Sequence, residues 1–264
     1  ATLINTGIGW HEARVPTITT SVPRAAFTWI TQRMKAEVSL PLITTNRINT
    51  PEVAESVLAQ GHADMVSMAR PFLADPDFVA KAMRNESDQI NTCIACNQAC
   101  LDHAFEQKRA SCLVNPQACY ETELIFKSVA VPKKLAVVGA GPAGLAFSTY
   151  AAARGHEVHL FEQANEIGGQ FNYAKQIPGK EEFHETLRYY NRRIQVTGVK
   201  LHLNTRVTAE ILKLEGFQEV VMATGIKPRL LTIPGNDHPK VMSYIDVLRD
   251  HKPVGKKVAV IGAG

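Results

Sequence analysis

Short apolar runs alternate with amphipathic stretches through the first 90 residues of the chain. The pattern predicts three strands and three helices, in alternation, at residues 2–8, 23–35, 42–45, 51–60, 65–68 and 76–84. Strands that alternate with helices are typical of a β/α repeat with a parallel sheet. Because a closed (β/α)8 barrel needs eight such units, we expect residues 1–90 to form only part of a barrel.

A second pattern begins at residue 131, after a stretch of little periodicity at residues 91–130. An apolar strand at 135–138 is followed by a glycine-rich loop, a helix that reaches about residue 153, and a strand at 157–161. This order is the βαβ unit of dinucleotide-binding folds. A further apolar run at 219–222 predicts another strand. We therefore expect an α/β protein with a Rossmann-like domain at residues 131–254.

The glycine-rich loop has the spacing Gly-x-Gly-x-x-Gly, at Gly139, Gly141 and Gly144. In dinucleotide-binding loops the first glycine permits a tight turn, the second lets the backbone approach a pyrophosphate, and the third packs helix on strand. Glu162 would accept a hydrogen bond from a ribose and repel a 2′-phosphate, so we expect FAD or NAD here rather than NADP. The alternative is a plain surface turn. Residues 168–170 either bring backbone close to the flavin or form an ordinary loop.

The segment KKLAVVGAG at residues 133–141 recurs as KKVAVIGAG at residues 256–264. Two dinucleotide motifs in one chain suggest one site for a flavin and one for a nicotinamide. The chain opens on Ala1 and stops inside the second motif. We therefore expect an internal fragment of a longer protein, in which residues 255–264 begin a truncated NAD(P)H-binding domain.

Four of the five cysteines follow the spacing C-x2-C-x3-C-x11-C, at Cys93, Cys96, Cys100 and Cys112. Three ligands crowded into eight residues favour a [4Fe–4S] cluster, which cysteine thiolates hold. Structural zinc sites usually show two separated cysteine pairs, which this spacing lacks. A structural zinc site and buried free thiols are the two alternatives to the cluster. Cys119 lies outside the spacing, and we expect it to be a small buried hydrophobe.

Polar residues follow each predicted strand of the N-terminal repeat, where barrel enzymes carry their chemistry. His11 follows the first strand and could donate a proton or polarise a carbonyl near neutral pH; the alternative is a structural histidine. Arg47 and Arg70 follow the next two strands, and each suits a phosphate of a cofactor at the barrel mouth. Either arginine could instead belong to an ordinary surface ion pair.

Composition narrows the class of protein without identifying it. With 45% hydrophobic and 20% charged residues, the 264-residue chain is typical of globular proteins. A net charge of +4 with scattered Lys and Arg gives little support for nucleic acid or membrane surfaces as partners. No apolar run approaches the length of a membrane span, and the start does not read as a secretion signal. We expect a cytoplasmic protein.

Five segments together resemble a known family, the bacterial NADPH-dependent 2,4-dienoyl-CoA reductases related to the old yellow enzymes. The segments are NTGIGWHEAR (5–14), TNRIN (45–49), MARPFLAD (68–75), CIACNQAC (93–100) and VVGAGPAG (137–144). In that family an N-terminal FMN-bearing TIM barrel precedes a four-cysteine [4Fe–4S] segment and then FAD and NADPH domains. The resemblance implies that residues 1–90 are the last strands of the barrel and residues 91–130 the cluster segment with its connector.

The resemblance also assigns roles to individual residues. It implies that His11 assists protonation of the substrate, that Arg14 contacts the substrate, and that the four cysteines ligate the cluster. It places Arg47, Ala69 and Arg70 at the FMN. The expected FAD site consists of Gly139, Gly141, Pro142, Ala143, Gly144, Glu162, Gly169, Gln170, Thr224 and Gly225.

The implied activity is reduction of a conjugated 2,4-dienoyl-CoA in the β-oxidation of unsaturated fatty acids. Electrons would pass from NADPH to FAD, through the cluster to FMN, and as hydride to the acyl-CoA, because a flavin converts between hydride and single-electron transfer. Two alternatives share these motifs: a 2-enoate reductase or trimethylamine-dehydrogenase-like enzyme, and a non-catalytic module that binds FAD or the cluster. With an incomplete barrel, we expect the 264-residue polypeptide alone to bind FMN poorly and to lack reductase activity.

Overall fold

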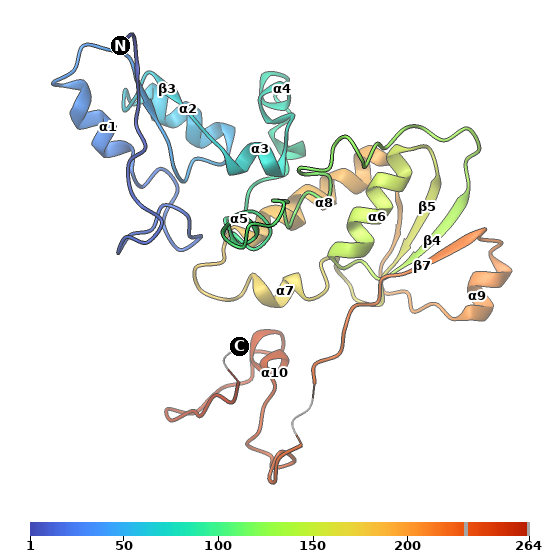
Figure 1. Cartoon of the computed structure of the whole chain (residues 1–264). Helices are drawn as coiled ribbons and strands as arrows, with labels where there is room; N and C mark the ends of the chain where they lie inside the picture. Colours follow the sequence, from blue (N-terminus) through green and yellow to red (C-terminus); the bar gives the residue numbers. More distant parts are fainter. Residues whose placement is uncertain (230–231, 263–264) are drawn as a thin grey trace.

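The computed structural model describes residues 1–229 and 232–262, and it contains two parallel sheets joined by an irregular segment (Figure 1). We call residues 1–90 the N-terminal unit, residues 91–130 the cysteine segment, and residues 131–225 the four-stranded unit. Both sheets consist of parallel strands alternating with helices, so the expected α/β class is confirmed.

The N-terminal unit contains a three-stranded sheet of order β1-β2-β3, in which all neighbours are parallel. Its strands are β1 (Ile4–Asn5), β2 (Leu42–Thr44) and β3 (Met65–Val66), and its helices are α1 (Thr28–Lys35), α2 (Pro51–Ala59), α3 (Arg70–Ala74), α4 (Phe78–Met83) and the 3-10 turn η1 (Ser87–Gln89). Helix α2 begins where expected, because the Thr50 side chain accepts a hydrogen bond from the Val53 N–H and Pro51 occupies the first turn.

The first helix begins later than the apolar pattern predicts, at Thr28 rather than near residue 23. Ala25 has a φ of +58°, which a right-handed helix does not allow, and its N–H donates to the Arg47 carbonyl at 2.8 Å. A tertiary contact therefore replaces the first helical turn. Strands β1 and β3 are also shorter than their apolar runs, at two residues each.

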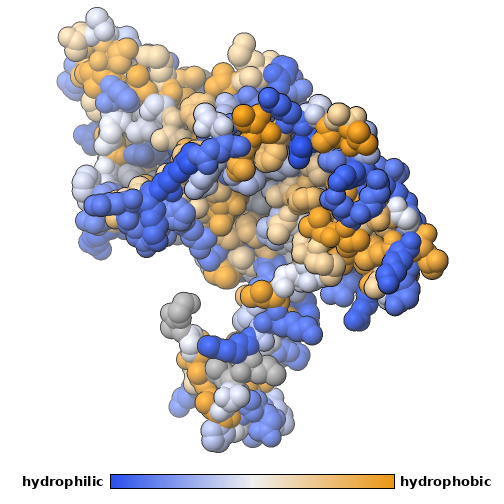
Figure 2. All heavy atoms as spheres, turned by 45° about the vertical axis from the view of Figure 1, so that its right-hand side comes forward, coloured by the Kyte–Doolittle hydropathy of each residue, from blue (hydrophilic) through white to orange (hydrophobic). Residues whose placement is uncertain are grey.

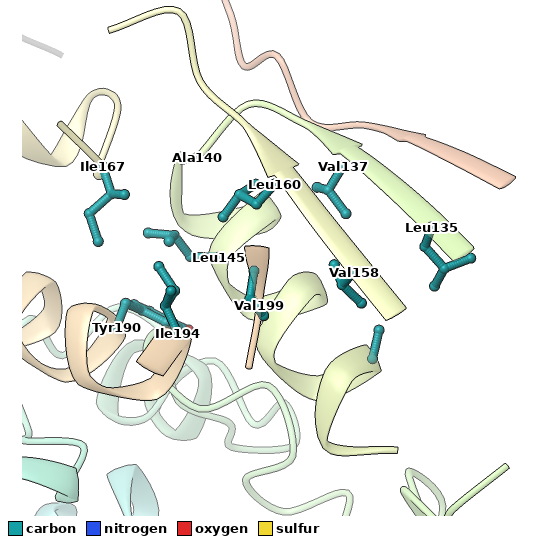
Figure 3. Packing of buried hydrophobic residues seen from close by; sticks show 11 residues of the cluster. Leu135, Val137, Ala140, Leu145, Val158, Leu160, Ile167, Tyr190, Ile194 and Val199 are labelled. Carbon is teal, nitrogen blue, oxygen red and sulfur yellow. The ribbon is translucent and has the colours of Figure 1, made fainter. Parts of the chain in front are cut away.

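The four-stranded unit has the strand order β6-β5-β4-β7, again entirely parallel. Its strands are β4 (Lys134–Val138), β5 (Glu157–Phe161), β6 (Lys200–His202) and β7 (Glu219–Met222), and its helices are α6 (Pro142–Ala153), α7 (Phe171–Ala174), α8 (Phe183–Thr197) and α9 (Ala209–Leu214). The two expected strands at 157–161 and 219–222 are confirmed residue for residue. Figure 3 shows the core of this unit, where Val137, Leu160 and Leu145 pack with Tyr190 and Ile194 of α8.

Helix α8 is the longest helix described, and the sequence interpretation above assigned no element to its residues. Its buried positions Phe183, Leu187, Tyr190 and Ile194 recur at helical spacing, and Gly198 ends it with a φ of +74°. It packs on α6 and also contacts η1 (Figure 1). Helix α8 therefore joins the two units.

The cysteine segment contains one short helix, α5 (Leu101–Phe105), and otherwise irregular backbone. A small apolar cluster surrounds the cysteines, with Ala74 from the N-terminal unit, Ile94 and Val114 from the segment itself, and Phe183 from α8. The three parts of the chain thus share one buried cluster.

The recurring segment at residues 256–264 forms no strand among its described residues. The described residues after position 225 contain the helix α10 (Tyr244–Leu248), which Ser243 and Asp246 cap reciprocally, but no strand. The apolar side chains of this segment remain in solvent, since Val258, Val260 and Ile261 are 58%, 83% and 66% exposed. Ala263 and Gly264, which complete the second glycine motif, lie outside the described residues.

Surface character agrees with the scattered charges of the sequence. On the face that Figure 2 shows, hydrophilic and hydrophobic residues are interspersed. Within residues 1–229 and 232–262, no helix combines the length and apolarity that crossing a bilayer requires.

Candidate functional site

The glycine-rich loop between β4 and α6 has the geometry that its spacing predicts. Gly139 has a φ of +107°, and a Cβ there would lie 2.3 Å from the Ala223 carbonyl oxygen. A Cβ on Gly144 would lie 1.9 Å from the Gly139 oxygen, so the helix meets the strand at that point. Gly141 differs, because no described atom lies within 4 Å of its would-be Cβ. Packing therefore requires glycine at positions 139 and 144, whereas Gly141 faces open space.

That open space lies at the N-terminus of α6, a twelve-residue helix. Gly141 is its N-cap residue, Pro142 and Ala143 begin the first turn, and no described side chain caps the free N–H groups. Unpaired N–H groups and the helix dipole together favour an anion at such an end. The site could hold the pyrophosphate of a dinucleotide.

Glu162, which we expected at a ribose, lies directly after β5. Its Oε2 accepts a hydrogen bond from the Ala140 N–H at 2.8 Å, and its Oε1 accepts from the Ala164 N–H at 2.9 Å. The carboxylate therefore fixes the glycine-rich loop from the side. It is half-buried, so part of it remains accessible to a ligand.

Two further loops approach the glycine-rich loop. The Gly168 N–H donates to the Ala140 carbonyl at 2.8 Å, and a Cβ on Gly169 would lie 3.2 Å from the Gly141 Cα. From the other side, the Cα of Thr224 lies 3.2 Å from the would-be Cβ of Gly139. Beyond Thr224, Gly225 turns the chain with a φ of +72°.

Gln170 joins the two loops, because its Nε2 donates to the Ile226 carbonyl at 3.2 Å. The structure thus brings together all the residues that we expected at the FAD.

The four spaced cysteines also come together. Cys93, Cys96, Cys100 and Cys112 line one pocket, with Arg70 and Asn97 beside them. Cys119 does not line this pocket, as its position outside the spacing suggested. Among residues 1–229 and 232–262, no group of three or more His, Cys, Asp or Glu side chains is placed so that it could hold a metal ion. The four sulfurs therefore line one pocket, but they do not converge on one metal-binding position.

Backbone N–H groups near the cysteines donate hydrogen bonds to the sulfurs. Burial raises the pKa of Cys93, and a hydrogen bond from the Ala95 backbone opposes that rise. Burial likewise raises the pKa of Cys112 to about 12, against hydrogen bonds from the Val114 and Asn115 backbone. Ala95 and Asn97 have φ values of +51° and +64°, and turns of this kind form the concave arrays of N–H groups seen at many iron–sulfur sites. The donor set fits a metal cluster that binds thiolates.

His11 lies in the turn after β1, and its Nε2 is 3.7 Å from a Glu12 oxygen. Its ring centroid lies 4.5 Å from that of Trp10 and 5.5 Å from that of Phe105 in α5. Arg14 lies on the same turn and is exposed. His11 therefore lies where the N-terminal unit meets helix α5 of the cysteine segment.

The two strand-end arginines are held by protein groups. Arg70, which follows the exposed Ala69 at the start of α3, donates to the Ile18 carbonyl at 2.9 Å and to Asn97 Oδ1 at 2.7 Å. Arg47 is buried, donates to the Val22 carbonyl at 2.7 Å, and pairs with Glu182 at 2.8 Å. Their placement at a phosphate stays a prediction.

Sequence reasoning missed the residues that join the units. Arg188 on α8 donates to the carbonyls of Asp88 and Ile90 at 2.6 and 2.8 Å and to Thr92 Oγ1 at 3.2 Å. Glu182 at the start of α8 accepts from Arg24, Arg47 and Asn49. The helical spacing of α8 could have located the helix, but no local pattern identifies partners that lie 96 or more positions away in the chain.

Two family models match the chain. Residues 133–264, half of the chain, match the pyridine nucleotide-disulphide oxidoreductase family. Residues 1–89 match the NADH:flavin oxidoreductase / NADH oxidase family. These descriptions support the flavin and nicotinamide chemistry that the sequence predicted.

Curated relatives match over nearly the whole chain. A metal reductase of Desulforamulus reducens is 42% identical over 99% of this chain, and a cinnamate reductase of Clostridium sporogenes is 35% identical over 88%. The chain spans 40% and 34% of the length of these two relatives.

Two solved structures share the fold over 96% of this chain. A 2-naphthoyl-CoA reductase in complex with 2-naphthoyl-CoA has a TM-score of 0.91 at 35% identity, and histamine dehydrogenase from Rhizobium sp. 4-9 has a TM-score of 0.83 at 25% identity. The chain covers 39% and 38% of them.

Proposed function

We infer, from a chain that belongs to the pyridine nucleotide-disulphide oxidoreductase family, that the whole protein is a flavin-dependent reductase of conjugated acyl-CoA thioesters. The observation that carries this proposal is the cysteine pocket, whose segment lies in the chain between residues 1–89 and 133–264, which match a flavin and a pyridine nucleotide oxidoreductase family. A cluster there would carry single electrons, and flavins on both sides would exchange them for hydride when bound. We propose NADPH as the donor and a 2,4-dienoyl-CoA as the acceptor.

The proposed roles follow from where each residue lies. The N–H groups at Gly141 and Ala143 would hold the FAD pyrophosphate, and Glu162 would hold its ribose. Cys93, Cys96, Cys100 and Cys112 would each ligate the cluster through a thiolate. The further FAD contacts would come from Gly169, Gln170, Thr224 and Gly225.

The substrate side of the proposal rests on the N-terminal unit. His11 would donate the proton that completes reduction of the double bond, since a histidine can exchange a proton near neutral pH. Arg14, exposed on the same turn, would contact the substrate. Arg47, Ala69 and Arg70 would be part of the FMN site. The CoA thioester named for the similar 2-naphthoyl-CoA reductase structure supports an acyl-CoA substrate here.

A second candidate is reduction of a free conjugated acid, which the similarity to a cinnamate reductase favours. The test is anaerobic purification of the full-length protein, with iron, sulfide, zinc, FMN and FAD quantified per chain. NADPH-dependent reduction would then be compared for a 2,4-dienoyl-CoA, 2-naphthoyl-CoA and cinnamate. Four irons and four sulfides with preference for the dienoyl thioester support the proposal. Zinc without sulfide refutes it, and preference for cinnamate supports the second candidate.

A further inference from the structure

Glu182 lies where the units meet, and its carboxylate is enclosed by donors from the N-terminal unit. Its side chain is 6% exposed. Oε1 accepts from Arg24 Nε at 3.0 Å and from Arg47 Nη2 at 2.8 Å. Oε2 accepts from Arg24 Nη2 at 2.5 Å and from Asn49 Nδ2 at 3.1 Å. One side chain of the four-stranded unit thus satisfies four donors of the other unit.

The same network reaches the cysteine pocket. Asn49 Nδ2 donates both to Glu182 and to the backbone carbonyl of Cys93, the second at 2.9 Å. A change at Glu182 would therefore reach the backbone of the first cysteine through one hydrogen-bonded amide.

Charge balance makes Glu182 hard to replace. The Arg47 side chain is 3% exposed, and beyond the Val22 carbonyl its partner among the described residues is Glu182. Arg24 is 30% exposed and also pairs with Glu185 at 3.1 Å, so it has a second anion and partial access to water. Loss of the Glu182 charge would leave Arg47 as a buried cation without an anion partner among the described residues, two residues before the Asn49 that contacts Cys93, where low dielectric keeps its field strong.

We propose that Glu182 is a positioning residue that fixes Arg47 and the Cys93 loop, and that its negative charge holds down the reduction potential of the cysteine-bound centre. The inference rests on the proposed function, because it requires a redox centre in the pocket. The physical reason is that an anion close to a one-electron centre disfavours the added electron, and an unbalanced cation favours it.

The test is a redox titration of the full-length holoprotein, followed by electron paramagnetic resonance of the reduced centre. Glu182→Gln keeps the side-chain size and removes the charge, and we expect the midpoint potential to move positive. Arg24→Gln removes a partly exposed cation from the same carboxylate, and we expect a negative shift. Glu185→Gln is the matched control, because Glu185 contacts Arg24 without reaching Arg47 or Asn49, and its shift should be the smaller one.

The outcomes separate this inference from the function on which it rests. Opposite shifts for Glu182→Gln and Arg24→Gln, with an altered resonance spectrum for the former, support the inference. Should Glu182→Gln fail to fold, a negative shift in Arg24→Gln supports the charge argument, and no shift overturns it. If an iron–sulfur centre is present and its midpoint potential is unchanged by both substitutions, this inference is overturned and the proposed function is not. Wild-type protein without iron and sulfide overturns the proposed function and this inference with it.

Discussion

Replacement of Gly141 by alanine should weaken FAD binding while leaving the fold intact. The residue has φ of −76° and ψ of 179°, which alanine adopts freely, and no described atom lies within 4 Å of the added methyl group. Alanine is a poorer N-cap than glycine by about 0.5–1 kcal/mol. It also restricts the unfolded chain, which returns about 0.4–1 kcal/mol. The two effects offset each other, so the free energy of unfolding should change by less than about 0.5 kcal/mol.

The same methyl group would stand where a pyrophosphate approaches the helix N-terminus. Loss of one charge-assisted hydrogen bond costs about 1.5–3 kcal/mol. Since about 1.4 kcal/mol corresponds to a factor of ten, the Kd for FAD should rise roughly tenfold to a hundredfold.

Gly144→Ala is the informative comparison, because its methyl group would lie 1.9 Å from a backbone oxygen. Overpacking costs up to about 3 kcal/mol, and better helix propensity returns about 1 kcal/mol. The free energy of unfolding should therefore fall by about 2 kcal/mol.

Urea denaturation of the apoprotein and flavin-fluorescence titration measure the two quantities separately. Gly255→Ala serves as the control, since Gly255 has no described atom near its would-be Cβ and lies outside the glycine-rich loop. The reasoning is refuted if Gly141→Ala binds FAD as tightly as wild type, or if it destabilises the fold as much as Gly144→Ala does.

Three further predictions concern the cysteine pocket and its supports. Cys96→Ser should remove most iron and sulfide from the full-length protein, whereas Cys119→Ser, outside the pocket, should retain both by colorimetric analysis. Arg188→Ala should lower the free energy of unfolding in urea by about 2 kcal/mol, because several carbonyls lose a charged donor; the exposed Arg206→Ala should change little, and equal losses would contradict the reasoning. Burial raises the pKa of Glu182, but its arginine partners outweigh burial and hold it below 4.5. Its stabilisation is therefore complete above pH 4.5 and lost as pH falls through the lower folded pKa, so Glu182→Gln should flatten stability over that acid range.

The sequence could predict what depends on local pattern. Glycine spacing predicted the loop at Gly139 and Gly144, because both the turn and the helix contact are consequences of a missing Cβ. Cysteine spacing predicted which four sulfurs share a pocket and which one does not. Strands β5 and β7 were predicted to the residue, since each is a short apolar run bounded by polar or turn residues.

What the sequence did not predict depends on partners distant in the chain. For Arg47 the sequence offered a phosphate contact or a surface ion pair, but no local pattern identifies the buried pair with Glu182, 135 positions away. Ala25 lies in an amphipathic stretch, but its N–H bonds to Arg47, which ends helical geometry there. The apolar run at residues 258–261 has strand composition and no strand beside it among the described residues. In each case tertiary contact, or its absence, overrides local propensity.

The apolar cluster around the cysteines has a consequence for the order of biosynthesis. Its members come from Ala74, from Ile94 and Val114, and from Phe183, so the apolar packing around the cysteines is complete only when α8 has been made. When translation has reached Cys112, the nascent chain contains all four cysteines of the pocket but only part of the apolar cluster around them. Metal binding and folding are coupled where the site does not exist in the unfolded chain. Cluster insertion would then have to wait for a helix that begins about seventy residues further along the message.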